Sequence, residues 1–188
     1  MLFVVLFLRD GATRPGYRAS YHPVSALALG PRGWLQTGNF VISGALIATA
    51  APAVWTVTGL RVLPLLVGAF GVGLVASGIF PMDPMRGYPP GTPTGDPKEF
   101  SASHRWHDRF GVPVFALLPA MPAVGAFTFG HLGWQVASGI VAVATAVFTV
   151  KFSTAWERDD PQTGLWQRLA LAGGMLWLAA FCAWLPTA

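Results

Sequence analysis

Long apolar stretches separated by shorter polar ones dominate this sequence from about residue 34 onwards. Five stretches contain no Asp, Glu, Lys or Arg: residues 34–58, 62–80, 110–129, 134–150 and 169–185. About 20 helical residues cross the hydrocarbon core of a bilayer, and these stretches reach or approach that length. Five such helices in 188 residues leave too little polar surface to cover them in water. The pattern therefore predicts an all-α polytopic membrane helix bundle.

We expect one integral membrane domain over residues 1–188. Its helices should span about 34–58, 62–80, 106–129, 134–153 and 166–185, with polar loops at 9–33, 81–105 and 154–165. Residues 1–8 are apolar but too few to span a bilayer, and they are followed by Arg9 and Asp10. We interpret them as the end of a first helix, the alternative being a short interfacial segment. The expected fold is thus five full transmembrane helices plus a partial N-terminal one.

Composition supports the same class. Apolar residues make up 53% of the chain and charged residues only 11%, against about 25% in ordinary soluble domains. If successive helices are antiparallel, eleven of the twelve Lys and Arg residues gather at one end of the bundle. The positive-inside rule would place that end in the cytoplasm. The net charge of +4 then reflects membrane topology and not a nucleic-acid partner.

The segment from Phe80 to Arg109 is the most polar interruption of this apolar chain. It contains four carboxylates and two histidines within thirty positions. Six prolines between positions 81 and 97 exclude a regular helix or a central strand there, because each removes a backbone donor and fixes φ. We expect a stiff polar cap at the charged end of the bundle.

Several short motifs resemble those of the DUF998 family of bacterial membrane proteins, whose function is uncharacterised. They are Pro15-Gly16-Tyr17, His22-Pro23-Val24-Ser25, Gly33-Trp34 through Asn39-Phe40, Gly78-Ile79-Phe80-Pro81-Met82-Asp83-Pro84, Gly87-Tyr88-Pro89-Pro90-Gly91 and His107-Asp108. The resemblance implies a six-helix bundle in the bacterial plasma membrane, and it leaves the orientation open. A more distant similarity, to the Frag1/DRAM/Sfk1 group of membrane proteins, carries over no catalytic residues.

The polar residues admit two interpretations. His104 and His107 are three positions apart at a helix start, so both could face one zinc ion, with Asp83 as a further ligand. Alternatively, Asp83 accepts backbone donors in a turn, while His107 hydrogen-bonds Asp83 and fixes the loop. We favour the structural network, so that no cofactor is expected, with Zn as the alternative.

We therefore expect an integral membrane protein without catalytic residues, whose cap binds a lipid headgroup or a small molecule. The expected partners are membrane lipids. One alternative is a metal-dependent membrane hydrolase, and a weaker one is a passive small-molecule transporter. The residues expected to form the polar cluster or ligand pocket are His22, Asn39, Ser43, Asp83, Tyr88, His107 and Asp108.

Overall fold

The computed structural model describes residues 1–128 and 130–185. Within these ranges it contains six α-helices, one short 3-10 helix and no strand. The helices are α1 (Leu2–Ala12), η1 (Val24–Ala28), α2 (Gly33–Thr58), α3 (Val62–Ile79), α4 (Ala102–Thr128), α5 (Leu132–Glu157) and α6 (Thr163–Trp184). The predicted all-α class is confirmed.

Helices α2 to α6 are each long and apolar enough to cross a membrane. Large apolar side chains cover their outer faces, for example Leu46, Leu65 and Val112, which are more than half exposed. An apolar surface of this extent would be unfavourable in water but matches lipid chains. α1 has 11 residues, about 16 Å of helix, which is roughly half of a hydrocarbon core. The expectation of five full spans and a partial N-terminal helix is therefore confirmed.

Several helices extend further than the charge-free stretches suggested. α4 begins at Ala102, four residues before the expected start, and α5 continues to Glu157. α6 begins at Thr163, so the connector between α5 and α6 covers only 158–162. The reason is physical: an absence of charge marks the width of the hydrocarbon, whereas helical hydrogen bonding continues into the polar interface.

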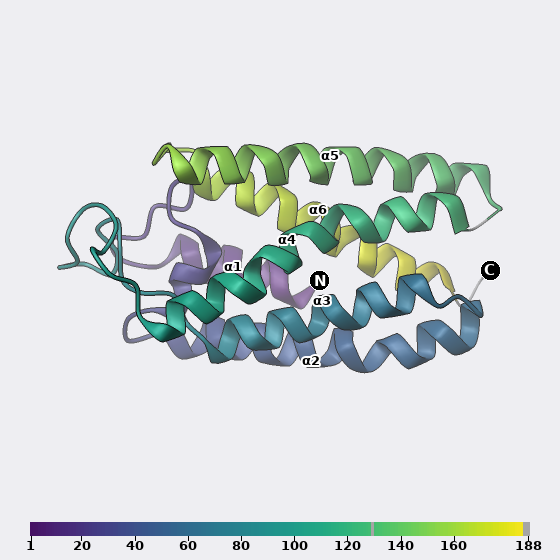
Figure 1. Ribbon diagram of the computed structural model, residues 1–188, viewed down its shortest axis with the longest axis horizontal. Helices are drawn as coiled ribbons and strands as arrows, with labels where there is room; N and C mark the ends of the chain where they lie inside the picture. Colours follow the sequence, from purple (N-terminus) through teal and green to yellow (C-terminus); the bar gives the residue numbers. More distant parts are fainter. Residues whose placement is uncertain (129, 186–188) are drawn as a thin grey trace.

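Figure 1 shows an elongated bundle in which α2 pairs with α3, while α4, α5 and α6 form the other side. α2 and α3 approach closely because glycines face one another. A Cβ atom added to Gly44 would lie 2.6 Å from the carbonyl oxygen of Gly71. α1 packs against α2, and the N-terminus lies partway along the bundle (Figure 1).

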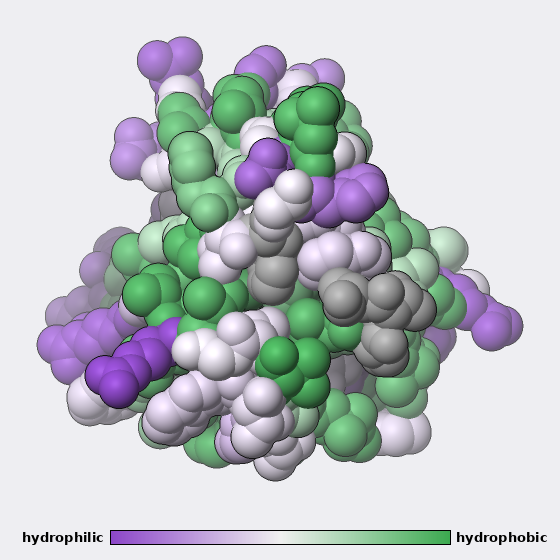
Figure 2. Space-filling model, turned by 90° about the vertical axis from the view of Figure 1, so that its right-hand side faces the viewer, coloured by the Kyte–Doolittle hydropathy of each residue, from purple (hydrophilic) through white to green (hydrophobic). Residues whose placement is uncertain are grey.

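The two ends of the bundle differ in character. One end carries residues 13–32, the loop 80–101 and the connector 158–162, which together we call the polar cap (Figure 1). The opposite end carries the α2–α3 and α4–α5 turns. Figure 2 looks onto this opposite end, where apolar and weakly polar side chains cover most of the face. Any polar ligand chemistry should therefore be sought at the cap.

Candidate functional site: a polar cap above an amphipathic groove

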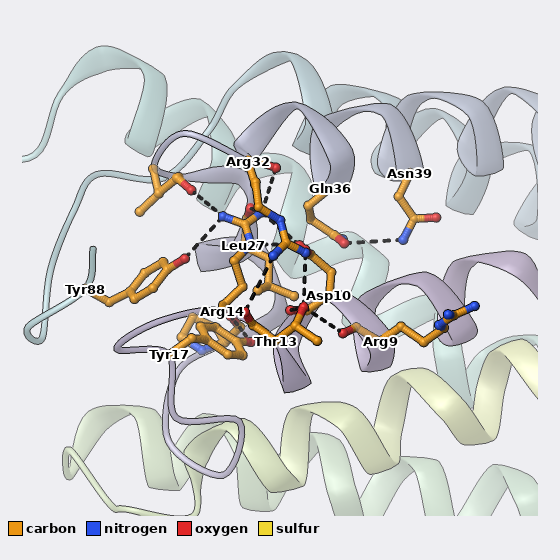
Figure 3. Close-up of polar contacts among 12 residues, drawn as sticks. Arg9, Asp10, Thr13, Arg14, Tyr17, Leu27, Arg32, Gln36, Asn39 and Tyr88 are labelled. Carbon is orange, nitrogen blue, oxygen red and sulfur yellow. Dashed lines mark hydrogen bonds and ion pairs between the residues drawn. The ribbon is translucent and has the colours of Figure 1, made fainter. Parts of the chain in front are cut away.

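Arg14 is the centre of the first network in the polar cap (Figure 3). Its Nε and Nη2 donate to the Asp10 carboxylate at 3.0 and 2.8 Å. Its remaining donors reach the Tyr88 hydroxyl and three backbone carbonyls, those of Leu27, Leu29 and Arg32. Arg32 donates to the other Asp10 oxygen at 2.5 Å. Asp10 is thus neutralised by two arginines, and Arg14 joins α1 to η1 and the proline-rich loop.

Arg86 fixes the loop 80–101 to α5. Its guanidinium lies over the Trp156 ring at 3.9 Å from the centroid and donates to the Trp156 carbonyl at 2.9 Å. It also pairs with Asp96 at 2.9 Å and with Asp159 at 3.4 Å. The backbone of Arg86 has φ 54°, a left-handed conformation that is strained for an arginine. The contacts that the buried Arg86 guanidinium makes with Trp156, Asp96 and Asp159 stabilise this strained backbone conformation.

Arg168, in the first turns of α6, holds the segment 13–32. Its Nη1 donates to the carbonyls of Ala19, Gly164 and His22, and its Nη2 donates to the Tyr17 hydroxyl. Burial raises the pKa of Tyr17 to about 12, although nearby Arg168 opposes this shift, so the phenol stays neutral. A buried arginine in each of three segments therefore builds the polar cap as one rigid unit.

His22 and Tyr88, two of the expected site residues, lie together inside the cap with ring centroids 5.3 Å apart. The Arg18 backbone N–H donates to Nδ1 of His22 at 2.9 Å, so Nε2 carries the proton and donates to the Arg86 carbonyl at 3.1 Å. Burial, with Arg18 and Arg168 nearby, lowers the pKa of His22. His22 is therefore a neutral side chain engaged at both ring nitrogens.

Asp83, Ser101 and His104 form the junction between the loop and α4. Asp83 donates its backbone N–H to Nδ1 of His104 at 2.9 Å, and its carboxylate accepts from the Ser101 N–H at 2.7 Å. The Ser101 hydroxyl accepts from the His104 N–H at 3.1 Å and so caps the helix. Burial alone would raise the pKa of Asp83, but the hydrogen bonds from Ser101 and the nearby charge of Arg105 lower it.

The structure corrects one expected contact. We expected His107 to bond Asp83, but His104 makes that bond, and Nδ1 of His107 donates to the Phe80 carbonyl at 2.8 Å. The reason is helical geometry. His104 lies in the first turn of α4, directly beside Asp83, whereas His107 lies one turn further along and meets the end of α3.

The residues proposed as zinc ligands are occupied by these contacts. Nδ1 of His104 accepts from Asp83, and its Nε2 lies 3.4 Å from the Asp108 carboxylate. Among the residues that the structure describes, no group of three or more His, Cys, Asp or Glu side chains is placed to hold a metal ion.

Asn39 and Ser43 belong to a different network, between α1 and α2. Nδ2 of Asn39 donates to the Phe3 carbonyl at 3.0 Å and to Oε1 of Gln36 at 3.3 Å, and Ser43 donates to Asn39. The expected site residues therefore divide into three groups: His22 with Tyr88, Asn39 with Ser43, and Asp83 with His107 and Asp108.

Two members of the third group, His107 and Asp108, line a groove between α4 and α5 with a volume of about 470 Å³, whereas Asp83 does not line it. α4 contributes one face, which runs from His104 to Ala116 at helical spacing. α5 contributes Thr149, Phe152, Ser153 and Trp156, the cap contributes Ser25 and Met82, and α6 contributes Gln167.

The sequence alone did not point to the α5 residues, which are some forty positions away and lie in an apolar stretch. It also did not single out the buried arginines Arg14, Arg86 and Arg168. Arg168 did carry a signal, since an arginine at the start of a membrane helix requires partners.

Comparisons with known proteins give one match. The model of a family described as "Protein of unknown function (DUF998)" matches residues 1–184, nearly the whole chain. Neither the curated proteins nor the solved structures gave a match.

Proposed function

This chain belongs to the DUF998 family, and from that premise we propose that it binds a membrane amphiphile in the groove between α4 and α5. The headgroup would lie at the polar cap, and the upper part of an acyl chain would lie along the helices. The protein would act as a lipid-binding protein and not as an enzyme. As part of the same proposal, we place it in the plasma membrane of bacteria.

The gradient of polarity along the groove is the observation that carries this proposal. At the cap end the wall is polar, with His107, Asp108 and Ser153, and deeper along α4 it becomes apolar at Val112 and Phe115. The α4 face from 104 to 116 corresponds to about 18 Å of helix. A lipid presents the same order of polarity over that depth.

The polar end of the groove favours a headgroup that donates hydrogen bonds. The Asp108 carboxylate is 61% exposed and accepts bonds only. Nδ1 of His107 donates to Phe80, so in the neutral ring Nε2 is an acceptor. An ammonium group or hydroxyls would satisfy these acceptors, and ethanolamine and glycerol headgroups carry such donors.

A further polar group lies inside the groove. The hydroxyl of Thr149 is buried and makes no hydrogen bond with the described residues. A ligand ester or an ordered water could pair with it. Because the cap is held by buried arginines, the groove is formed in advance, which reduces the ordering cost of binding.

The test uses two matched glycine substitutions. A Cβ atom at Gly111, which lines the groove, or at Gly139, which lies on α5 outside it, would meet no atom within 4 Å. Gly111→Leu should fill the groove without disturbing the protein, and Gly139→Leu makes the same chemical change elsewhere. Native mass spectrometry after gentle detergent extraction should show a retained lipid on wild type and Gly139→Leu, and several-fold less on Gly111→Leu.

The headgroup preference is tested with Asp108→Asn. This variant should retain less phosphatidylethanolamine, because the exposed carboxylate that would pair with the ammonium is lost. Equal lipid retention by Gly111→Leu and Gly139→Leu would refute binding in the groove, whatever the Asp108 variant does.

A further inference from the structure

A second cavity lies between α1 and α2, with a volume of about 270 Å³, and it shares no residue with the groove. Its polar lining is Arg9, Asp10, Thr13, Arg32 and Gln36. Most of these side chains are hydrogen-bond donors, in contrast to the acceptors at the polar end of the groove. The two sites are therefore suited to opposite ligand chemistry.

Gln36 supplies the observation that points to a ligand here. The side chain is only 1% exposed and lines the cavity, yet its Nε2 makes no hydrogen bond with any described residue. The amide orientation is fixed by its neighbours, because Oε1 accepts from Asn39, which in turn donates to Phe3. A buried amide donor without an acceptor is unfavourable, so an acceptor inside the cavity would satisfy it.

The charges around the cavity favour an anion. Asp10 is the one carboxylate of the lining and already accepts from Arg14 and Arg32, while Arg9 also lines the cavity and adds a further positive charge. The Arg32 side chain is 44% exposed and retains donors beyond those that Asp10 and Thr13 accept. Arg9 is exposed and extends along α1 away from the Asp10 network (Figure 3), with no ion pair among the described residues. Its long side chain can reach an anion at the mouth.

We propose that this cavity binds a phosphate group, held by the guanidinium groups of Arg9 and Arg32 and by Nε2 of Gln36. Arginine is well suited to phosphate because its planar fork donates two parallel hydrogen bonds. Leu6 and Leu35 flank the polar lining. The cavity lies near the end of α1 at the polar cap, where lipid phosphates are found. The phosphate could belong to a lipid or be free in solution.

The test measures thermal unfolding of the full chain in detergent while one probe is titrated. The probes are sodium phosphate, dioctanoyl-phosphatidylglycerol, and dioctanoylglycerol as a lipid without phosphate. A ligand that binds only the folded state raises the unfolding midpoint, which gives an apparent Kd. Arg9→Gln and Gln36→Glu should each weaken phosphate binding about tenfold, since a hydrogen bond to a charged group is lost.

Both variants are chosen to preserve the fold. Arg9 is exposed, and the glutamate in Gln36→Glu still accepts from Asn39. Arg158→Gln is the matched control, because Arg158 is an exposed arginine at the same end of the bundle and lines neither cavity.

Each outcome either identifies the source of the phosphate or overturns the proposed phosphate site. Stabilisation by phosphatidylglycerol alone identifies a lipid phosphate, and stabilisation by sodium phosphate identifies a free anion. Equal stabilisation by phosphatidylglycerol and dioctanoylglycerol would overturn the proposal, as would no stabilisation by either phosphate probe. Equal weakening by Arg9→Gln and Arg158→Gln would also overturn it, because the effect would then be one of overall charge.

Discussion

At the scale of single residues, the polar cap is organised by hydrogen bonds to backbone atoms. His104 illustrates this, because its ring accepts from the Asp83 N–H while its own N–H is capped by Ser101. From the sequence we predicted that His107 would bond Asp83 and fix the loop, but His104 makes that bond. The sequence could not distinguish the two histidines, because both are near Asp83 along the chain and the course of the loop decides which one meets it.

His104→Ala should lower the free energy of unfolding by about 1–3 kcal/mol, the usual cost of leaving a buried donor unpaired. His104→Asn should cost less, since an asparagine oxygen can take the place of Nδ1 as the acceptor. Denaturant unfolding in detergent micelles measures both. If the two variants were equally unstable, the bond to Asp83 would not be the source of the effect.

His22 should make the protein sensitive to mild acid. Burial lowers the pKa of His22 below its ordinary value of 6.5, so below that pH the unfolded chain binds a proton that the folded chain excludes. Stability therefore falls as the pH drops from 7.5 to 5.5. Asp83 does not contribute in this window, because its pKa is lowered from 3.8.

The measurement is the slope of the unfolding midpoint against pH. His22→Gln should be less stable overall but should show a flatter slope than wild type. Parallel slopes for the two proteins would mean that another group causes the acid sensitivity.

At the scale of helices, the sequence predicted the membrane spans well, because a long apolar stretch in lipid is stable only as a helix that satisfies its own backbone hydrogen bonds. The helix ends were predicted less well, as α4 and α5 show, because they depend on caps and on the polar interface. The groove could not be predicted at all. The groove requires one particular face of α4 to lie beside one particular face of α5, and this arrangement follows from helix packing and not from hydropathy.

Two glycines of α3 give a matched test of helix packing. A Cβ atom at Gly71 would lie 2.6 Å from the carbonyl oxygen of Gly44 on α2, whereas a Cβ atom at Gly68 would meet Ala51 at an ordinary 3.4 Å. Gly71→Ala should force the helices apart and lower the free energy of unfolding by about 1–3 kcal/mol, the range seen for overpacked cores. Gly68→Ala should be neutral or stabilising by up to about 1 kcal/mol, from helix propensity.

Unfolding in a denaturing detergent compares the two variants directly. A loss of stability in Gly68→Ala as large as that in Gly71→Ala would contradict the close α2–α3 contact.

At the scale of the whole molecule, the fold is a membrane bundle with the polar cap at one end and short helix connections at the other. The buried arginines, the groove and the phosphate cavity all lie in the polar cap or directly beside it. The opposite end carries the α2–α3 and α4–α5 turns. Sequence reasoning predicted this asymmetry because charge and proline both concentrate in the connectors at one end. It could not predict the division of the cap into separate networks.

We predict the orientation from the same asymmetry. The positive-inside rule would place the polar cap in the cytoplasm. Thr94→Cys in the loop should then react with an impermeant maleimide only in inverted vesicles, and His131→Cys at the opposite end only in right-side-out vesicles. The reverse pattern would place the cap outside.

The most direct test of lipid binding in the groove is to map where a lipid touches the protein. Protein in phosphatidylcholine nanodiscs would be irradiated with a trace of phosphatidylethanolamine that carries a diazirine near the top of its acyl chain, and the labelled peptides would be sequenced. Binding in the groove predicts labels concentrated on residues 111–116 of α4 and 149–156 of α5, lost in Gly111→Leu and kept in Gly139→Leu. Labels spread evenly over the exposed faces of α2 to α6, and unchanged by Gly111→Leu, would show that the groove is not a lipid site.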